Sequence, residues 1–254
     1  VEINGLPLEK QRAEIARKRR HGMGYLGLGS SLSMMQMVYG DDESLKFTEE
    51  VTKVLAQVGW EVGIELAQEK GAAPVMDEEF EVNAEMLAKR PEMKKRGHKI
   101  GDKIKGKVLL GKYSRYMQQF PKELQDQIAK SGVRFTHHSS IAPTGTISLS
   151  LANNASNGIE PSFAHHYSRN VIREGKKTKE KVDVFSFELL AYRHLINENA
   201  MPLSDKEEEK LPEYFIDSST IKAKAHIDIQ AASQKWIDSS ISKTINCPVD
   251  IDFN

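Results

Sequence analysis

The clearest pattern along the chain is a helical spacing of apolar residues over 42–70. Apolar side chains recur there at steps of three and four residues, and Gly71 follows the run. This spacing predicts one long amphipathic helix that ends before Gly71 and turns its apolar stripe toward the core. The stripe consists of Leu45, Val51, Val54, Leu55, Val58, Val62 and Leu66.

Shorter segments on both sides carry weaker helical signals. Residues 10–20 are a basic run of good helix formers, for which we expect a helix with a solvated face. Apolar spacing predicts three further helices. These lie at 121–130, 186–197 and 225–240.

Other segments are expected to be extended or irregular. Residues 166–187 alternate basic and β-branched positions, which favours a hairpin or a lid-like loop. Residues 133–136 and 139–142 are expected to be extended, and 242–246 to form a final strand. Residues 90–112 are rich in Lys, Arg and Gly, and an exposed loop is expected there.

Glycines at 22–29 include a G-x-G-x-x-G pattern that begins at Gly22. A dinucleotide-binding fingerprint requires a strand before the glycines and an acidic residue about 20 positions later. A charged helical run precedes them here, and Glu43 and Glu49 lie inside the long predicted helix. Close packing of the glycine backbone against a neighbouring element is therefore the favoured interpretation.

Charge and cysteine content limit the classes of function. The chain has 36 basic and 36 acidic residues, so no overall positive field attracts nucleic acid or an acidic membrane. No window of the sequence is apolar enough to span a bilayer. Cys247 is the single cysteine, which excludes an intrachain disulfide and a thiolate-rich zinc site and favours a cytoplasmic protein.

The most informative motif is the segment 139–149, Ser-Ser-Ile-Ala-Pro-Thr-Gly-Thr-Ile-Ser-Leu. It predicts a buried strand, a tight turn and the start of a helix. Pro143 stiffens the turn, Gly145 permits close backbone approach, and hydroxyl groups lie beside free amides. A phosphate is one natural occupant of such a turn, and an ordinary helix cap is the alternative.

Three other sets of candidate residues give weaker evidence for a functional site. The pairs His137-His138 and His165-His166 can each offer one inward ring if they lie on strands, so a metal site is not favoured. Cys247 has no identifiable base and is expected to be a buried free thiol. Glu160, which is held extended before Pro161, is weak evidence for acid–base chemistry.

Taken in order, several motifs resemble the C-terminal half of the ribonucleotide reductase large chain. The amino-acid sequence around Gly145 is most similar to its adenosylcobalamin-dependent subgroup. The matching segments cover nearly the whole chain. They are Arg19 to Leu28, Arg134, Ser140 to Ser148, Ser156 to Pro161 and Trp236 to Pro248.

This resemblance implies an α/β fold, with residues 1–254 forming part of a ten-stranded α/β barrel. It implies reduction of a ribonucleoside di- or triphosphate to the 2′-deoxyribonucleotide by thiyl-radical chemistry, with adenosylcobalamin as cofactor. The family's loop that holds the substrate phosphates corresponds here to Ala142, Pro143, Thr144, Gly145, Thr146 and Ile147.

The chain also departs from the family pattern. The radical cysteine and the redox cysteine pair have no counterpart, so no catalytic residue is assigned, and Phe135 stands where the family leads us to expect Asn. We therefore expect a piece that needs the N-terminal half of the barrel, with a homodimer as one candidate assembly, and without membrane or direct nucleic-acid contacts. A non-catalytic nucleotide-binding module and a structural complement of a split enzyme are the alternatives.

We expect the isolated chain to form no deoxynucleotide when it is supplied with ribonucleotide, adenosylcobalamin and a dithiol. The reason is that one cysteine cannot supply both a thiyl radical and a reducing pair. Product formation above the level of a protein-free control would refute the expectation.

Overall fold

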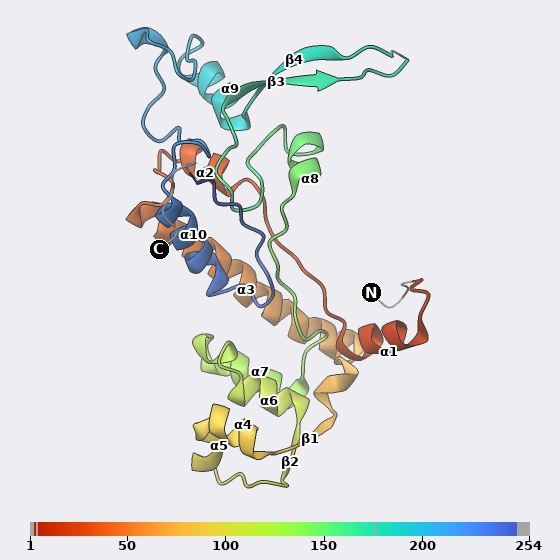
Figure 1. Ribbon diagram of the computed structural model, residues 1–254. Helices are drawn as coiled ribbons and strands as arrows, with labels where there is room; N and C mark the ends of the chain where they lie inside the picture. Colours follow the sequence, from red (N-terminus) through yellow and green to blue (C-terminus); the bar gives the residue numbers. More distant parts are fainter. Residues whose placement is uncertain (1–2, 4, 176, 248–254) are drawn as a thin grey trace. The chain divides into compact units, whose positions relative to one another are not determined.

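The computed structural model describes residues 3, 5–175 and 177–247 and divides into two compact units. One unit consists of Val1–Met23 and Lys53–Ser140, and the other of Gly24–Thr52 and Ile141–Asn254. Figure 1 shows the elements of both units in sequence colours.

Helices dominate the first unit, with one small sheet. It holds the larger part of α3 (Asp42–Lys70), a helix that the sequence pattern predicted with its end at Gly71. Its other elements are α1 (Glu9–Lys18), η1 (Pro74–Met76), β1 (Glu79–Glu81), α4 (Ala84–Lys89), α5 (Pro91–Lys95), β2 (Lys103–Lys105), α6 (Gly106–Tyr113), η2 (Met117–Gln119) and α7 (Lys122–Ser131).

The expectation of an exposed loop over 90–112 is wrong. This stretch forms α5, β2 and α6, and β2 pairs antiparallel with β1. Met93 and Ile104, widely spaced among its charges, are buried, and so is Tyr113, which follows the stretch. They pack with Val82 and Leu87, so a few well-placed apolar side chains were enough to order a segment whose composition is mostly charged.

The apolar stripe of α3 is also placed differently from the prediction. Val54, Val58 and Val62 are 56%, 49% and 41% exposed, and they line a groove of about 580 Å³. The buried face carries the large apolar residues Trp60 and Ile64, and its other buried residues are small or polar. These are Ser44, Thr48, Thr52, Ala56 and Ala67. Small side chains permit close packing of the helix, which a search for large apolar residues overlooks.

Ring packing anchors α3 in the first unit. The Trp60 ring lies edge-on to the buried His138 ring at 5.1 Å and tilted against Phe135 at 5.9 Å. Phe135, which replaces the polar residue expected from the family pattern, is therefore a core residue. Residues 137–140 lie beside residues 21–23, with a parallel bridge between Met23 and Ser139, whereas bends at Arg134 and Thr136 interrupt the extended course expected over 133–136.

A close contact explains the glycine at position 22, which begins the G-x-G-x-x-G pattern. A Cβ at this position would lie 2.1 Å from Ser140 Oγ, so any other residue would require this hydroxyl to move. The preceding element is α1 and not a strand, which confirms packing as the role of Gly22 and removes the context that a dinucleotide fingerprint requires.

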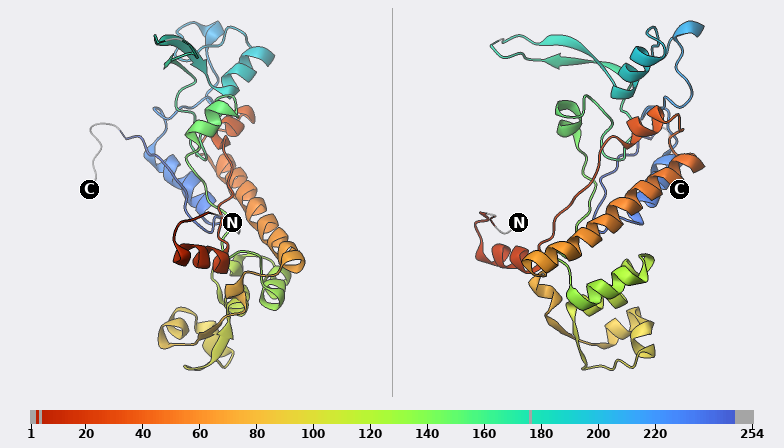
Figure 2. Two further views of the ribbon diagram at one scale, coloured as in Figure 1. Left: turned by 90° about the vertical axis from the view of Figure 1, so that its right-hand side faces the viewer. Right: turned by 180° about the vertical axis from the view of Figure 1, so that it is seen from behind.

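The second unit combines helices with one hairpin. β3 (His166–Val171) and β4 (Glu180–Phe185) pair antiparallel, as the alternation predicted, and the hairpin extends away from α9 in Figure 2. Apolar residues from α2, α9 and α10 form much of its core. The remaining elements are α2 (Leu28–Met34), the start of α3, α8 (Gly145–Ser150), α9 (Phe187–Leu195), η3 (Glu207–Glu209) and α10 (Ala223–Gln234).

The expected barrel is not closed among the described residues. They contain two small antiparallel sheets, and parallel pairing is limited to isolated bridges such as Ile141 with Ile241. The predicted strand at 242–246 is wrong, because beyond Ser242, whose N–H donates to Ile141 O at 2.8 Å, no ladder continues. The mixture of helices and strands agrees with the prediction, and half of a ten-stranded barrel stays a prediction.

Substitution of Ile64 by Ala should lower the free energy of unfolding by about 2–4 kcal/mol, because Ile64 is 4% exposed. Val58→Ala is the matched control, since it replaces a β-branched residue in the same helix but at an exposed position. Its effect should stay within about 0.5 kcal/mol. Urea denaturation measures both, and equal losses would contradict the described orientation of α3.

Candidate functional site

A left-handed residue shapes the turn before α8. Thr144 has φ 55° and ψ 20°, a conformation that is uncommon for residues other than glycine. Its hydroxyl accepts a hydrogen bond from the Gly158 N–H at 2.8 Å, which ties this turn to the second turn that the sequence singled out. The side chain of Thr144 therefore holds the turn in place.

The turn leaves three consecutive amides available. Ser148 N–H donates to Thr144 O at 2.9 Å, whereas the amides of Gly145, Thr146 and Ile147 donate to no acceptor among the described residues. Such amides are expected in the first turn of any helix. The turn is open to solvent, because Ala142, Pro143, Thr146 and Ile147 are exposed.

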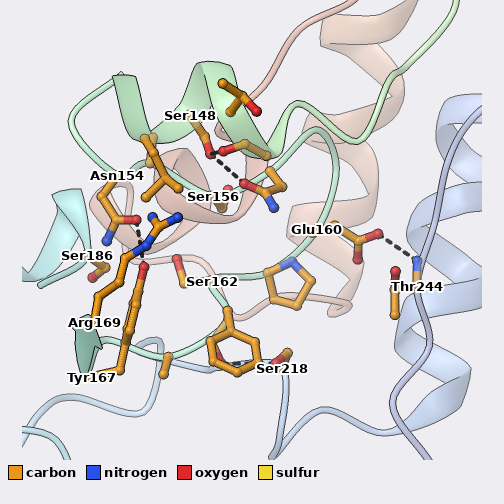
Figure 3. Close-up of a pocket in the computed structure, with 18 of the residues that line it drawn as sticks. Ser148, Asn154, Ser156, Glu160, Ser162, Tyr167, Arg169, Ser186, Ser218 and Thr244 are labelled. Carbon is orange, nitrogen blue, oxygen red and sulfur yellow. Dashed lines mark hydrogen bonds between the residues drawn. The ribbon is translucent and has the colours of Figure 1, made fainter. Parts of the chain in front are cut away.

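The turn borders a pocket of about 870 Å³ in the second unit (Figure 3). Of the six residues predicted to bind phosphate, Gly145 and Thr146 line the pocket. Ala142, Pro143, Thr144 and Ile147 do not. Ala142, Pro143 and Thr144 shape the turn, and the side chain of Ile147 is exposed.

Hydroxyl and carboxamide groups make up most of the polar lining. Ser148 Oγ lies 2.6 Å from Asn157 Oδ1 and 3.0 Å from Gly145 O, which links the two turns. The sequence singled out 154–161, but it did not identify the lining residues from distant segments, which share no motif or spacing. These are Ser162, Tyr167, Arg169, Ser186, Ser218 and Asn246.

One carboxylate lines the pocket, and it is already paired. Glu160 accepts hydrogen bonds from the buried Lys243 ammonium and from Thr244 N–H at 2.6 Å. Lys243 Nζ also lies 2.6 Å from Nδ1 of His226. Burial and the Lys243 charge lower the pKa of His226 to about 4, so its ring is neutral near pH 7 and accepts this bond.

A buried carboxylate lies behind the pocket wall. Glu188, on α9, is 1% exposed and accepts hydrogen bonds from the hydroxyls of Ser30, at 2.6 Å, and Ser162. Its Oε1 lies 3.2 Å from Nδ1 of His165. Burial acts to raise the pKa of Glu188, but the hydrogen bonds from His165 and the two serines outweigh it, so the pKa is lowered.

Glu188 acts on the lining through these partners. Ser30 and Ser156 exchange two hydrogen bonds, of 2.8 Å and 3.1 Å, and Ser156 and Ser162 both line the pocket. His165 Nδ1 also lies 3.1 Å from the hydroxyl of Ser186, another lining residue. The arrangement fixes the wall of a binding pocket.

The other candidate residues contribute no chemistry to this pocket. His138 and His165 are buried while His137 and His166 are partly exposed, as expected for alternating side chains. Within residues 3, 5–175 and 177–247, no three His, Cys, Asp or Glu residues gather as a metal site. Cys247 is exposed, which corrects the expectation of a buried thiol, since no element covers the chain after the last bridge.

Comparison with known proteins gives one consistent family. The model of the ribonucleotide reductase barrel domain matches residues 1–254. A vitamin B12-dependent ribonucleoside-diphosphate reductase of Thermoplasma acidophilum is 24% identical over 98% of this chain and 27% of its own length. The protein of the same name from Mycobacterium tuberculosis H37Rv is 24% identical over 98% of this chain and 29% of its own. The chain thus spans less than a third of these relatives.

Glu188→Gln should reduce the loss of stability at low pH. Because the folded-state pKa of Glu188 is below its ordinary 4.5, its contribution is present above that value and is lost as pH falls through the folded pKa. Urea denaturation at about pH 5 and about pH 3 should show a smaller difference for the variant than for the unchanged chain. An identical difference would argue against an ionised Glu188.

Proposed function

Since the chain belongs to the ribonucleotide reductase barrel-domain family, we propose that it supplies the substrate phosphate-binding loop of a ribonucleoside di- or triphosphate reductase. The observation that carries the proposal is the turn at 142–147. Its amides at Gly145, Thr146 and Ile147 have no acceptor among the described residues, and the turn borders a large pocket whose lining includes many hydroxyl and carboxamide groups. Backbone amides in such a turn form a concave site for anions.

The remaining lining supports a nucleotide as the ligand. A pocket of about 870 Å³ falls in the range that holds small molecules and cofactors. Serine and threonine hydroxyls and the carboxamides of Asn154, Asn157 and Asn246 can exchange hydrogen bonds with a sugar and phosphates. Glu160 adds little repulsion, because Lys243 balances its charge.

Adenosylcobalamin supplies radical chemistry in enzymes that use it, and the relatives' names mention vitamin B12. Imidazole and thiolate are the protein groups that suit later transition metals, and the described lining of the pocket contains neither His nor Cys. The residues of this pocket therefore do not fit the cofactor. We place the cofactor outside this pocket and derive no step through it.

The wider assembly follows from the same proposal. Residues 1–254 would form the C-terminal part of the catalytic barrel, completed by an N-terminal half, with a homodimer as one candidate assembly. The described helices include none with the length and apolar character of a membrane span. The soluble nucleotide substrate and the single cysteine favour a cytoplasmic location.

A second function, a non-catalytic nucleotide-binding module, is favoured by one observation. The pocket lining holds no thiol, and the single cysteine, Cys247, lies outside it. Turnover after reconstitution with an N-terminal barrel half would decide for the reductase. Nucleotide binding without turnover in that complex would decide for the module.

Thr146→Asp should weaken binding of a ribonucleoside diphosphate by about tenfold or more, because it places a like charge beside the anion. Folding should be retained, since an acidic residue in a first helical turn is favourable. Thr146→Asn is the matched neutral control and should retain most of the affinity. Isothermal titration calorimetry measures all three proteins.

Equal affinity of the Asp and Asn variants would move the phosphate away from the turn. Absence of any nucleotide binding by the unchanged chain would remove the proposed role of the loop altogether.

A further inference from the structure

The charge on the described pocket lining is unbalanced at one residue. Two lining side chains carry full charges near pH 7, Glu160 and Arg169. Glu160 is neutralised by Lys243, as described above. Arg169, by contrast, forms no ion pair with any carboxylate among the described residues, so the pocket has an excess positive charge on the side of β3.

The register of the hairpin explains why Arg169 lacks an acidic partner. Arg169 lies opposite Val182, and the nearest acidic residue on the same face is Glu180, opposite Val171. Glu180 is engaged by Arg173, through bonds of 2.8 Å and 3.2 Å. Asp183 lies opposite Ser168, from which it accepts a hydrogen bond of 3.2 Å, on the other face of the hairpin.

Neighbouring contacts hold this part of β3 at the pocket. Tyr167 shares a strand face with Arg169, and its hydroxyl donates to Asn154 Oδ1 at 3.2 Å. Asn154 in turn donates from Nδ2 to Phe185 O on β4 at 2.8 Å. Figure 3 shows the Arg169 guanidinium beside Asn154 and the Tyr167 hydroxyl, on the side of the pocket that also holds Ser148.

An arginine in this position matches a particular ligand chemistry. The guanidinium group is planar and presents paired N–H donors that fit two oxygens of one phosphoryl group. The amides of the 142–147 turn can bind one phosphoryl group on their own. A separate cation in the same pocket is therefore suited to a second phosphoryl group of the same ligand.

We propose that Arg169 is a phosphate-binding residue that holds a second phosphoryl group and so makes the pocket prefer nucleoside diphosphates over monophosphates. This inference rests on the proposed function, because it takes the 142–147 turn as the site of the other phosphoryl group. Arg169 thereby becomes a specificity-determining residue contributed by the hairpin.

The test compares a ribonucleoside monophosphate and the corresponding diphosphate by calorimetry. Arg169→Gln should weaken diphosphate binding about fivefold to twentyfold and change monophosphate binding less than about twofold. Lys181→Gln is the matched control, since it removes a positive charge from the other face of the same hairpin, at an exposed residue outside the pocket lining. It should leave both affinities unchanged.

Each outcome separates this inference from the proposed function. If diphosphate binds and Thr146→Asp weakens it while Arg169→Gln does not, the role of Arg169 is wrong and the loop stands. Equal weakening by Arg169→Gln and Lys181→Gln would show a general effect of charge and would also overturn the inference. If the unchanged chain binds neither nucleotide, the proposed function fails first, and the inference fails with it.

Discussion

The buried carboxylate of Glu188 is the interaction on which the pocket depends. One side chain from α9 is held by Ser30 of α2 and by Ser162 and His165 of the segment before β3. A buried charge is tolerated only when such donors surround it, and removal of a partner leaves an uncompensated charge. The wall of the pocket therefore acts as one connected unit, which favours a preorganised binding site.

Fixed polar groups of this kind suit a ligand that brings its own charge. Lys243 balances the charge of the Glu160 carboxylate, while the open turn and Arg169 line the pocket. Under the proposed function, the positions of these donors would select a nucleotide. The chemical step would then belong to residues outside this pocket.

Much of the local structure followed from sequence patterns, because helix spacing, Gly71 and the alternation over 166–187 act over short distances. The orientation of α3 did not follow, since its buried face is built largely from Ser, Thr and Ala, residues that carry little hydrophobic signal. The motif around Gly145 could be found from its local turn chemistry. Arg169, Ser186 and Ser218 could not, because only the folded chain brings such distant positions to one cavity.

The exposure of Cys247 has a practical consequence for work on association. A solvent-accessible thiol oxidises readily, and two chains can then be joined through sulfur. A dimer seen without reductant would therefore be no measure of non-covalent self-association. Sedimentation in the presence of a reducing agent, or with serine at this position, reports the intrinsic assembly state.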